Sequence, residues 1–478
     1  MATKKDLVEA YSFNRRRLVT AFVSGAPGGR EVEPARPGRM IVGGAALAVL
    51  LVAGAAIAGA LTRSAPVSFD QPALVTDDRG ALYVILDKND SPGEPTLRPV
   101  INVTSAQLIL GSEESARRVR DKDLARPKGP AIGILDAPAT VPAADQLINS
   151  GWTSCTGAGQ GLHTVVQTSP AVDAVDRRAF LATSASTGRT YVIAETSAPG
   201  RPRAAYRYEA PAGNDALLSA VADATRQDAV TVPDAWLALI PEGGPLDARG
   251  LGIAGLGRPA GLPGYAGALV GDLVERDGRS FAITSSGLVR LSPFADRVLR
   301  STSLGPRLPE VLTPAAGAPF DTVGETYASA QWPDEVPRGT VDDGSELCAV
   351  LDTGRDEAPS VHLALARDGS DLAESVAAGT SPVEVASGRG ALVRVGGFDS
   401  ASARSVYLVD ERGRTYPLAG KQELTNLGYA DVPPVVVPDT WNRLFAPGPE
   451  LSQSAALCPP GSTQGAQGAD GAAGGTCS

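Results

Sequence analysis

The stretch from Met40 to Leu61 constrains this chain more than any other, because its 22 residues carry no charged side chain. It lies between Arg39 and Arg63. About 20 apolar residues are needed to cross the hydrocarbon core of a bilayer as a helix, and a helix satisfies its own backbone hydrogen bonds there. Its many Gly and Ala residues suit close contact between membrane helices. We therefore predict a transmembrane helix over residues 40–61.

A cleaved signal peptide is the alternative interpretation of this stretch, since small residues suited to cleavage are abundant within it. Signal-peptide cores are usually about 7–15 residues long and lie close to the N-terminus. Here the apolar run is longer and begins only after a 39-residue leader. Both observations favour a retained anchor.

The charges on either side of the anchor predict its orientation. Residues 1–39 have a net charge of +4, whereas the whole chain has a net charge of −10. Positively charged segments remain on the cytoplasmic side of the membrane. We therefore expect a single-pass protein of the plasma membrane with a cytoplasmic N-terminus and most of the chain outside. The excess of Arg over Lys reflects GC-rich codons and indicates an actinobacterial source.

Composition and low-complexity segments divide the chain further. We predict a cytoplasmic segment over 1–39, the anchor over 40–61, a folded outer part over 62–455 and a Gly-rich disordered tail over 456–478. The outer part is acidic, which argues against binding to nucleic acid.

The cytoplasmic segment contains a predicted amphipathic helix over residues 5–22. Apolar side chains fall near one of its faces, and arginines cluster elsewhere. The helix could lie on an anionic leaflet, dock on a partner's cytoplasmic domain, or act only as a basic stop-transfer flank. For docking, the candidate residues are Tyr11, Phe13, Arg16, Arg17 and Leu18.

The outer part contains four similar segments, each of which reads as a strand, a glycine-containing turn and a strand with an aromatic residue. They lie around residues 74–86, 191–210, 268–284 and 405–420, with turn glycines Gly80, Gly200, Gly278 and Gly413. Glycine allows the positive φ that tight hairpins require. A longer match joins V-P-D-A-W at 232–236 to V-P-D-T-W at 437–441. Proline suits the start of a helix, so we expect Trp236 and Trp441 to be core anchors on two short helices.

These repeats predict an elongated, β-rich α+β fold, in which four hairpin-containing repeats surround a central β domain with quasi-twofold symmetry. Cys155 and Cys348 each lie midway through one half of the apparent duplication, so we favour a disulfide between them. Cys458 and Cys477 could form a second pair in the tail. All four cysteines lie on the expected outer side, where disulfides persist. Unpaired buried thiols are the alternative.

Motifs that would indicate catalysis are absent from the sequence. Lys421 is the one lysine that directly follows a glycine, and the P-loop pattern is not present around it. The two histidines, His163 and His362, lie in no recognisable triad motif, and the scattered cysteines do not have zinc-site spacing. A glycosidase-type pair of carboxylates stays open as an alternative in so acidic a chain, although no pair stands out. We predict no catalytic, cofactor or metal residues, and a structural or binding protein in place of an enzyme.

Several of these features together resemble one known family. The cytoplasmic pattern A-Y-x-F-x-x-R-R-L begins at Ala10, and L-R-P-V-I-N-V-T-S-A-Q-L-I-L-G follows at 97–111. With the four repeats, the two central cysteines and the paired V-P-D-x-W segments, they resemble EccB, a single-pass membrane component of actinobacterial type VII (ESX) secretion systems. The resemblance extends to about residue 455 and does not include the Cys458–Cys477 tail.

The resemblance implies a core part of an inner-membrane secretion channel. Its implied partners are the EccC-type motor ATPase, the EccD-type channel, the EccE-type component, a mycosin protease and further copies of the chain itself. It also implies repeat domains like those of a phage lysin's cell-wall-binding subunit. Members of this family have been labelled ATP-hydrolysing, but no phosphate-binding motif supports that label here.

Three alternative functions are therefore compatible with the sequence. The first is a scaffold that assembles a secretion complex. The second is a membrane-anchored module that binds peptidoglycan, which predicts exposed aromatic residues in the repeats, whereas a scaffold predicts buried ones. The third is an ectoenzyme that hydrolyses nucleotides, which requires a pocket with converging acidic and basic groups. The sequence favours the scaffold.

Overall fold

The computed structural model describes residues 4–24, 67–88, 95–111, 115–157, 159–175, 177–196, 203–247, 249–323, 331–340, 346–354, 357–398 and 405–462. The chain forms two compact units, Met1–Arg63 and Ser64–Ser478. The predicted anchor over 40–61 lies outside the described residues. Within the ranges given above, no helix combines the length and apolar character needed to cross a membrane.

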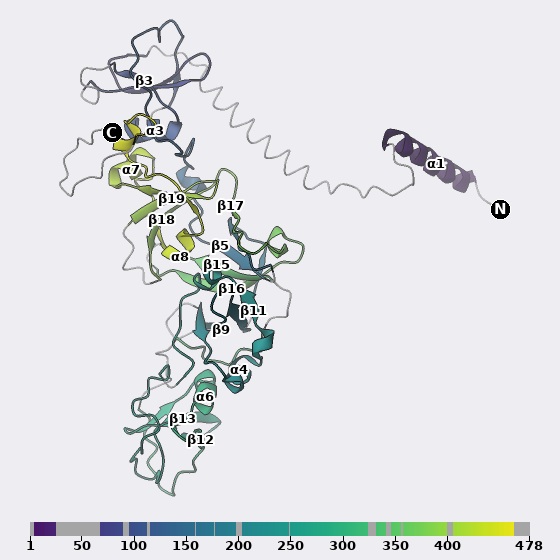
Figure 1. Ribbon diagram of the computed structural model, residues 1–478, viewed down its shortest axis with the longest axis vertical. Helices are drawn as coiled ribbons and strands as arrows, with labels where there is room; N and C mark the ends of the chain where they lie inside the picture. The colour runs from purple at the N-terminus through teal and green to yellow at the C-terminus, as the bar shows by residue number, and fades with distance from the viewer. Residues whose placement is uncertain are drawn as a thin grey trace. The chain divides into compact units, whose positions relative to one another are not determined.

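The first unit contains helix α1 (Lys4–Ser24), which includes the whole of the predicted cytoplasmic helix (Figure 1). Tyr11 is 75% exposed, and Phe13 and Leu18 are each 69% exposed. The side chains of Arg16 and Arg17 are outside the described part of the helix. The apolar side chains of α1 that the structure describes are therefore open to solvent.

The second unit contains two four-stranded arrangements with the same strand order. One consists of β1 (Ala73–Thr76), β2 (Leu82–Ile85), β3 (Leu97–Pro99) and β4 (Arg117–Arg118). The other consists of β8 (Phe180–Ser184), β9 (Thr190–Thr196), β10 (Ala204–Glu209) and β11 (Val230–Val232). In each, three strands form an antiparallel meander, and the fourth pairs in parallel with the first.

The two other outer sheets follow the same scheme. A three-stranded sheet consists of β12 (Leu273–Arg276), β13 (Arg279–Ile283) and β14 (Leu288–Arg290), and Val311 bridges in parallel to its first strand. A five-stranded sheet consists of β18 (Ala391–Gly396), β19 (Ser405–Val409), β20 (Arg414–Leu418), β21 (Val435–Pro438) and β22 (Ala446–Pro447). There β21 pairs in parallel with β18.

A helix follows the meander of each of these four sheets. These helices are α3 (Val103–Leu110), α4 (Asp215–Ala222), α6 (Pro293–Arg300) and α7 (Lys421–Asn426). Local sequence explains where they begin. The side chains of Asn102, Asn214 and Ser292 accept a hydrogen bond from a backbone N–H in the first turn of α3, α4 and α6, as N-cap residues do.

A six-stranded sheet draws three strands from each half of the chain. Its strands are β5 (Trp152–Thr156), β6 (His163–Val166), β7 (Val172–Ala174), β15 (Leu347–Asp352), β16 (Ser360–Ala366) and β17 (Val383–Val385). Antiparallel strands β5 and β15 place Cys155 opposite Cys348, and the two form a disulfide across 193 residues of sequence. This sheet is where the two halves of the chain are covalently joined.

The remaining helical turns are short. They are η1 (Ala144–Gln146), η2 (Arg226–Asp228), η3 (Asp371–Ala373), α5 (Asp234–Leu237), α8 (Asp439–Asn442) and α9 (Gln453–Ala456). Helix α9 crosses the predicted boundary between the outer part and the tail at residue 455. The described chain continues to residue 462, and Cys458 is buried and disulfide-bonded. Cys477 lies outside the described residues.

Shared hydrophobic cores join these sheets. The largest joins the sheets of β8–β11 and β12–β14, and a second joins the six-stranded sheet to those of β8–β11 and β18–β21. The β1–β4 sheet has a core on each face, one of which packs with α3. Helices α3 and α9 are in contact, so an early and a late segment of the second unit lie side by side.

The predicted turn glycines lie in hairpins wherever they are described. Gly80 joins β1 to β2, Gly278 joins β12 to β13, and Gly413 joins β19 to β20, with φ of +87°, +69° and +69°. Gly200 is outside the described residues. In the first and third sheets the hairpin is therefore the first of the meander, and in the last it is the second.

Candidate functional site

Both repeated tryptophans are completely buried, and each lies on a short helix that begins after a proline. Trp236 belongs to α5 and donates its indole N–H to the backbone O of Ser154 at 3.0 Å. Trp441 belongs to α8 and donates to the backbone O of Leu239 at 2.9 Å. The two side chains share one core with Trp152. Their contacts are those of packing residues.

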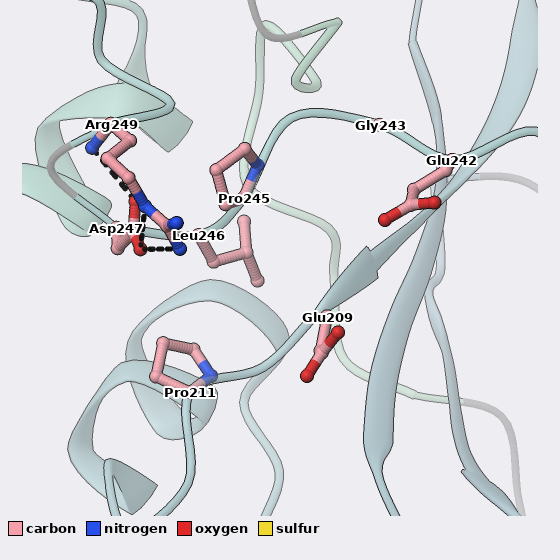
Figure 2. A pocket seen from close by; sticks show the side chains of 8 residues that line it. All are labelled: Glu209, Pro211, Glu242, Gly243, Pro245, Leu246, Asp247 and Arg249. Atoms are coloured by element: carbon pink, nitrogen blue, oxygen red, sulfur yellow. Dashed lines mark hydrogen bonds and ion pairs between the residues drawn. The ribbon is translucent and has the colours of Figure 1, made fainter.

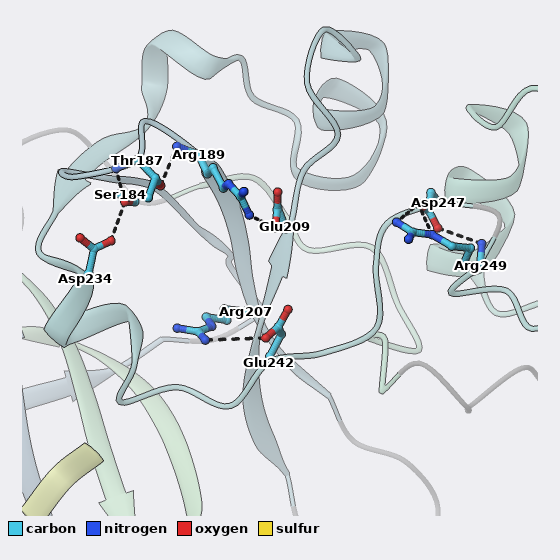
Figure 3. Close-up of polar contacts among 9 residues, drawn as sticks. All are labelled: Ser184, Thr187, Arg189, Arg207, Glu209, Asp234, Glu242, Asp247 and Arg249. Carbon is cyan, nitrogen blue, oxygen red and sulfur yellow. Dashed lines mark hydrogen bonds and ion pairs between the residues drawn. The ribbon is translucent and has the colours of Figure 1, made fainter. Parts of the chain in front are cut away.

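A polar cluster holds the start of α5 against the end of β8 (Figure 3). The Ser184 hydroxyl donates to the carboxylate of Asp234 at 2.5 Å and accepts from the hydroxyl of Thr187 at 2.7 Å. Hydrogen bonds from Ser184 and Ser186 hold the pKa of Asp234 below its ordinary value. A carboxylate in the first turn of a helix is also favoured by the helix dipole. This cluster therefore fixes α5, and with it the loop that follows.

The loop after α5 forms one wall of a pocket of about 340 Å³. The backbone of Arg207 on β10 donates to Pro241 O and accepts from Gly243 N–H, both at 2.9 Å, so the loop runs alongside β10. Figure 2 shows Glu209 and Glu242 on one side of the pocket and the Asp247–Arg249 pair on the other. The remaining lining residues are Pro211, Gly243, Pro245 and Leu246.

Each carboxylate of this pocket already has a cationic neighbour. Glu209 lies 3.2 Å from Arg189, and Glu242 lies 3.9 Å from Arg207 (Figure 3). Asp247 accepts two bonds from the Arg249 guanidinium, at 2.8 and 3.0 Å. Burial acts to raise the pKa of Asp247, but the bonds and charge of Arg249 outweigh it and hold the pKa below its ordinary value. Asp247 therefore stays ionised, and Arg249 is committed to it.

This arrangement suits a cationic or hydrogen-bond-donating group better than a phosphate. Three carboxylates and one already paired arginine line the pocket, and phosphate sites need several free cations or backbone N–H groups. Within the described ranges, no cluster of His, Cys, Asp or Glu has the geometry of a metal site. We identify no nucleophile with an adjacent base among the pocket residues.

The duplicated V-P-D-x-W segments contain one sequence feature that indicates this pocket. Aligning the two V-P-D-x-W segments places Glu242 opposite Pro447 and Gly243 opposite Gly448. The glycines share a role, because a Cβ at Gly243 would lie 2.2 Å from the ring of Tyr208, and one at Gly448 would lie 2.4 Å from the ring of Tyr416. Glu242 has no acidic counterpart in the second copy, so this carboxylate is specific to the first copy.

We predict that Gly243→Ala destabilises the folded unit by about 1–3 kcal/mol, the usual cost of overpacking a core. The Tyr208 ring cannot move aside, because it is fully buried and its hydroxyl donates to the backbone of Gln331. Urea unfolding followed by circular dichroism measures the change. Gly420→Ala is the control, since its Cβ would lie 3.5 Å from its nearest neighbour, Glu423. Equal midpoints for both variants would contradict the close contact.

The structure does not bring the predicted residues together into one site. Trp236 and Trp441 share a core, whereas Cys155 and Cys348 lie in another core with Leu372. The turn glycines belong to separate sheets, and Tyr11, Phe13 and Leu18 belong to the other unit. The predicted residues are therefore spread through the chain and do not form one site.

Comparisons with known proteins match the chain to a single family. The family model described as "Type VII secretion system ESX-1, transport TM domain B" matches residues 1–462. The "ESX-1 secretion system ATPase EccB1" of Mycolicibacterium smegmatis is 25% identical over 420 residues, which is 80% of each chain. The "ESX-3 secretion system ATPase EccB3" of Mycobacterium tuberculosis is 27% identical over 403 residues, or 76% of this chain and 73% of the relative.

Solved structures show the same fold. A chain of an intact ESX-5 inner membrane complex superposes with a TM-score of 0.58 at 21% identity, covering 96% of this chain and 95% of that one. A chain of the EccB3 dimer from the ESX-3 core complex also gives 0.58, at 24% identity, covering 80% of this chain and 99% of that one. These likenesses support the strand-rich α+β fold.

Proposed function

Because this chain belongs to the EccB family of type VII secretion systems, we propose that it is a structural component of an ESX inner-membrane complex. The observation that carries the proposal is the family match over residues 1–462, which includes both units. The identification from the sequence is thereby confirmed. Of the aromatic residues on the return strands of the repeats, Phe281 and Tyr416 are buried, and Tyr83 and Tyr206 are half-buried. This fits a scaffold better than a module that binds peptidoglycan through exposed rings.

We further propose that the chain is anchored once in the plasma membrane by residues 40–61. Residues 1–39 would then be cytoplasmic, residues 62–455 would form the outer repeat and central domain, and residues 456–478 would form a tail. The uncharged 22-residue run and the +4 charge before it support this arrangement.

The fold supports a repeat interpretation. We infer that the four outer sheets are copies of one unit in a quasi-twofold arrangement around the six-stranded sheet. Three observations support this. The first strand of each meander pairs in parallel with a fourth strand in three of the sheets, and with the single residue Val311 in the sheet of β12–β14. A helix follows each meander, and both halves contribute equally to the six-stranded sheet.

The relatives carry "ATPase" in their names, but we propose a non-catalytic role for this chain. The sequence has no P-loop. The described pocket beside β10 is lined by carboxylates and one committed arginine, which would repel a polyphosphate. Energy for secretion would then come from a motor partner.

The partners that we propose are an EccC-type ATPase, an EccD-type channel, an EccE-type component, a mycosin protease and further copies of this chain. The relatives support assembly, since their structures are named as an inner membrane complex and a dimer. The exposed Tyr11 and Phe13 of α1 support docking on the cytoplasmic side.

The test is extraction in mild detergent from cells that express the surrounding secretion genes, followed by native sizing and mass spectrometry. We expect a large assembly that contains a motor ATPase and a multi-pass membrane protein. Tyr11→Glu with Phe13→Glu should lower the recovered ATPase at least fivefold, because a charge on a docking face costs about 1–3 kcal/mol or more. Ser12→Ala, on the same helix, is the control. A lone monomer or dimer would overturn the assembly role.

A further inference from the structure

One segment covers the face of the β1–β4 sheet that lies opposite α3, and it carries an excess of cations. This segment, the cationic lid, consists of residues 117–128. Val119 and Leu124 are buried in it and pack with Ala73, Val75 and Ile85 of the sheet. Val119 N–H also donates to Thr76 O at 2.8 Å. The lid is therefore a fixed part of the fold.

The described carboxylates beside the lid already have ion-pair or hydrogen-bond partners. Asp78 lies 3.1 Å from Arg118, and Asp123 lies 3.3 Å from Arg120. Asp121 accepts the backbone N–H of Asp78 at 3.3 Å. Three exposed cations of the lid have no carboxylate partner in the described part of the chain: Lys122, Arg126 and Lys128. Although the whole chain is acidic, this face presents free positive charge.

Two of these cations lie on aromatic rings. The Arg126 guanidinium is 4.0 Å from the centroid of the Phe69 ring, and the Lys128 ammonium is 4.5 Å from that of Tyr83. Lys128 also donates to the Tyr83 hydroxyl at 3.4 Å. A cation over an aromatic ring keeps its charge while the ring holds it in place, and the charged ends of Lys and Arg side chains extend from apolar surface toward water and lipid headgroups.

The lid packs with the first described residues that follow the proposed anchor. Residues 62–66 separate the end of the anchor from Val67, and an extended chain covers at most about 3.6 Å per residue. Val67 therefore starts within roughly 20 Å of the membrane surface, and Val67 and Phe69 pack against the core beneath the lid. Cations attract anionic lipids over about one Debye length, some 8 Å at physiological salt.

We propose that the cationic lid docks on the anionic phospholipids of the outer leaflet and so orients the first sheet on the membrane. The proposal rests on the membrane anchoring proposed above. Each Lys or Arg near an anionic surface strengthens binding by about fivefold. Loss of Lys122, Arg126 and Lys128 together should therefore weaken docking by about a hundredfold.

The experiment uses the full chain in lipid nanodiscs of phosphatidylcholine alone or mixed equally with phosphatidylglycerol. Hydrogen exchange of the amides of residues 117–128 is measured by mass spectrometry. We expect exchange to be at least fivefold slower in the anionic discs. The triple variant Lys122→Gln, Arg126→Gln, Lys128→Gln should lose this protection, and so should the unaltered chain in high salt, where screening is strong.

A matched control removes three exposed arginines elsewhere: Arg258→Gln, Arg279→Gln and Arg290→Gln. It should keep the protection. Equal exchange in both kinds of disc would overturn the proposal, and so would protection in neutral discs on adding a soluble polyphosphate at the same phosphate concentration, which would assign the lid to free anions. Failure of the chain to co-elute with neutral discs would refute the anchor itself, and the docking proposal with it.

Discussion

Alanine in place of Trp441 is expected to lower the free energy of unfolding of the second unit by about 3–5 kcal/mol, the range for a buried tryptophan. The side chain is completely buried in the core that joins the six-stranded sheet to its two neighbours. Its loss would leave a cavity where three sheets meet. It would also leave the carbonyl of Leu239 without the indole N–H that it accepts at 2.9 Å.

Urea unfolding of the purified chain, followed by far-ultraviolet circular dichroism, measures this loss. Trp441→Phe should recover more than half of it, because most of the apolar volume returns without the hydrogen bond. Leu135→Ala is the control, since Leu135 is 56% exposed, and it should cost less than about 1 kcal/mol. A loss below about 1 kcal/mol for Trp441→Ala would show that α8 does not hold the sheets together.

Burial of the two repeated tryptophans could be predicted because their sequence signal is local. In each copy a proline precedes an aspartate and a tryptophan, and the structure places that proline at the N-cap of a short helix. The disulfide between Cys155 and Cys348 could be predicted in the same way, because each cysteine lies midway through one half of the apparent duplication. The identification of the family followed from the order of such local signals along the chain.

What the sequence could not provide were the partners brought together by folding. The indole of Trp236 meets Ser154, which is 82 residues away. The pocket beside β10 depends on a loop running alongside that strand, and nothing in the sequence around Glu209 or Glu242 indicates that they line the same pocket. The position of the glycine turn within the meander also differs between sheets. It joins the first and second strands at Gly80 but the second and third strands at Gly413. A shared turn motif did not reveal which strands it connects.

The second large loss of stability is expected on substitution of Asp272, which is completely buried and forms an ion pair with Arg307. Arg307 donates to both of its carboxylate oxygens at 2.7 Å. The backbone N–H groups of Leu269 and Glu310 donate to it at 2.8 and 3.0 Å. Asp272→Ala would leave the two backbone N–H groups unpaired and would remove the buried partner of Arg307, so we expect a loss of about 3–5 kcal/mol in the free energy of unfolding. Asp173→Ala breaks an exposed pair with Arg367 and should cost less than about 1 kcal/mol.

Acid titration provides a second, independent readout of the same site. Burial alone would raise the pKa of Asp272, but the bonds from Arg307, Glu310 and Leu269 outweigh it and hold the pKa below its ordinary value. A carboxylate with a lowered pKa in the folded state stabilises the fold fully above its unfolded pKa of about 3.9, and this contribution is lost as the pH falls through the folded pKa. The stability difference between the unaltered chain and Asp272→Asn should therefore be constant at neutral pH and shrink below about pH 4. A difference that persists unchanged to lower pH would mean that the ionised carboxylate is not what holds β12 to the segment around Arg307.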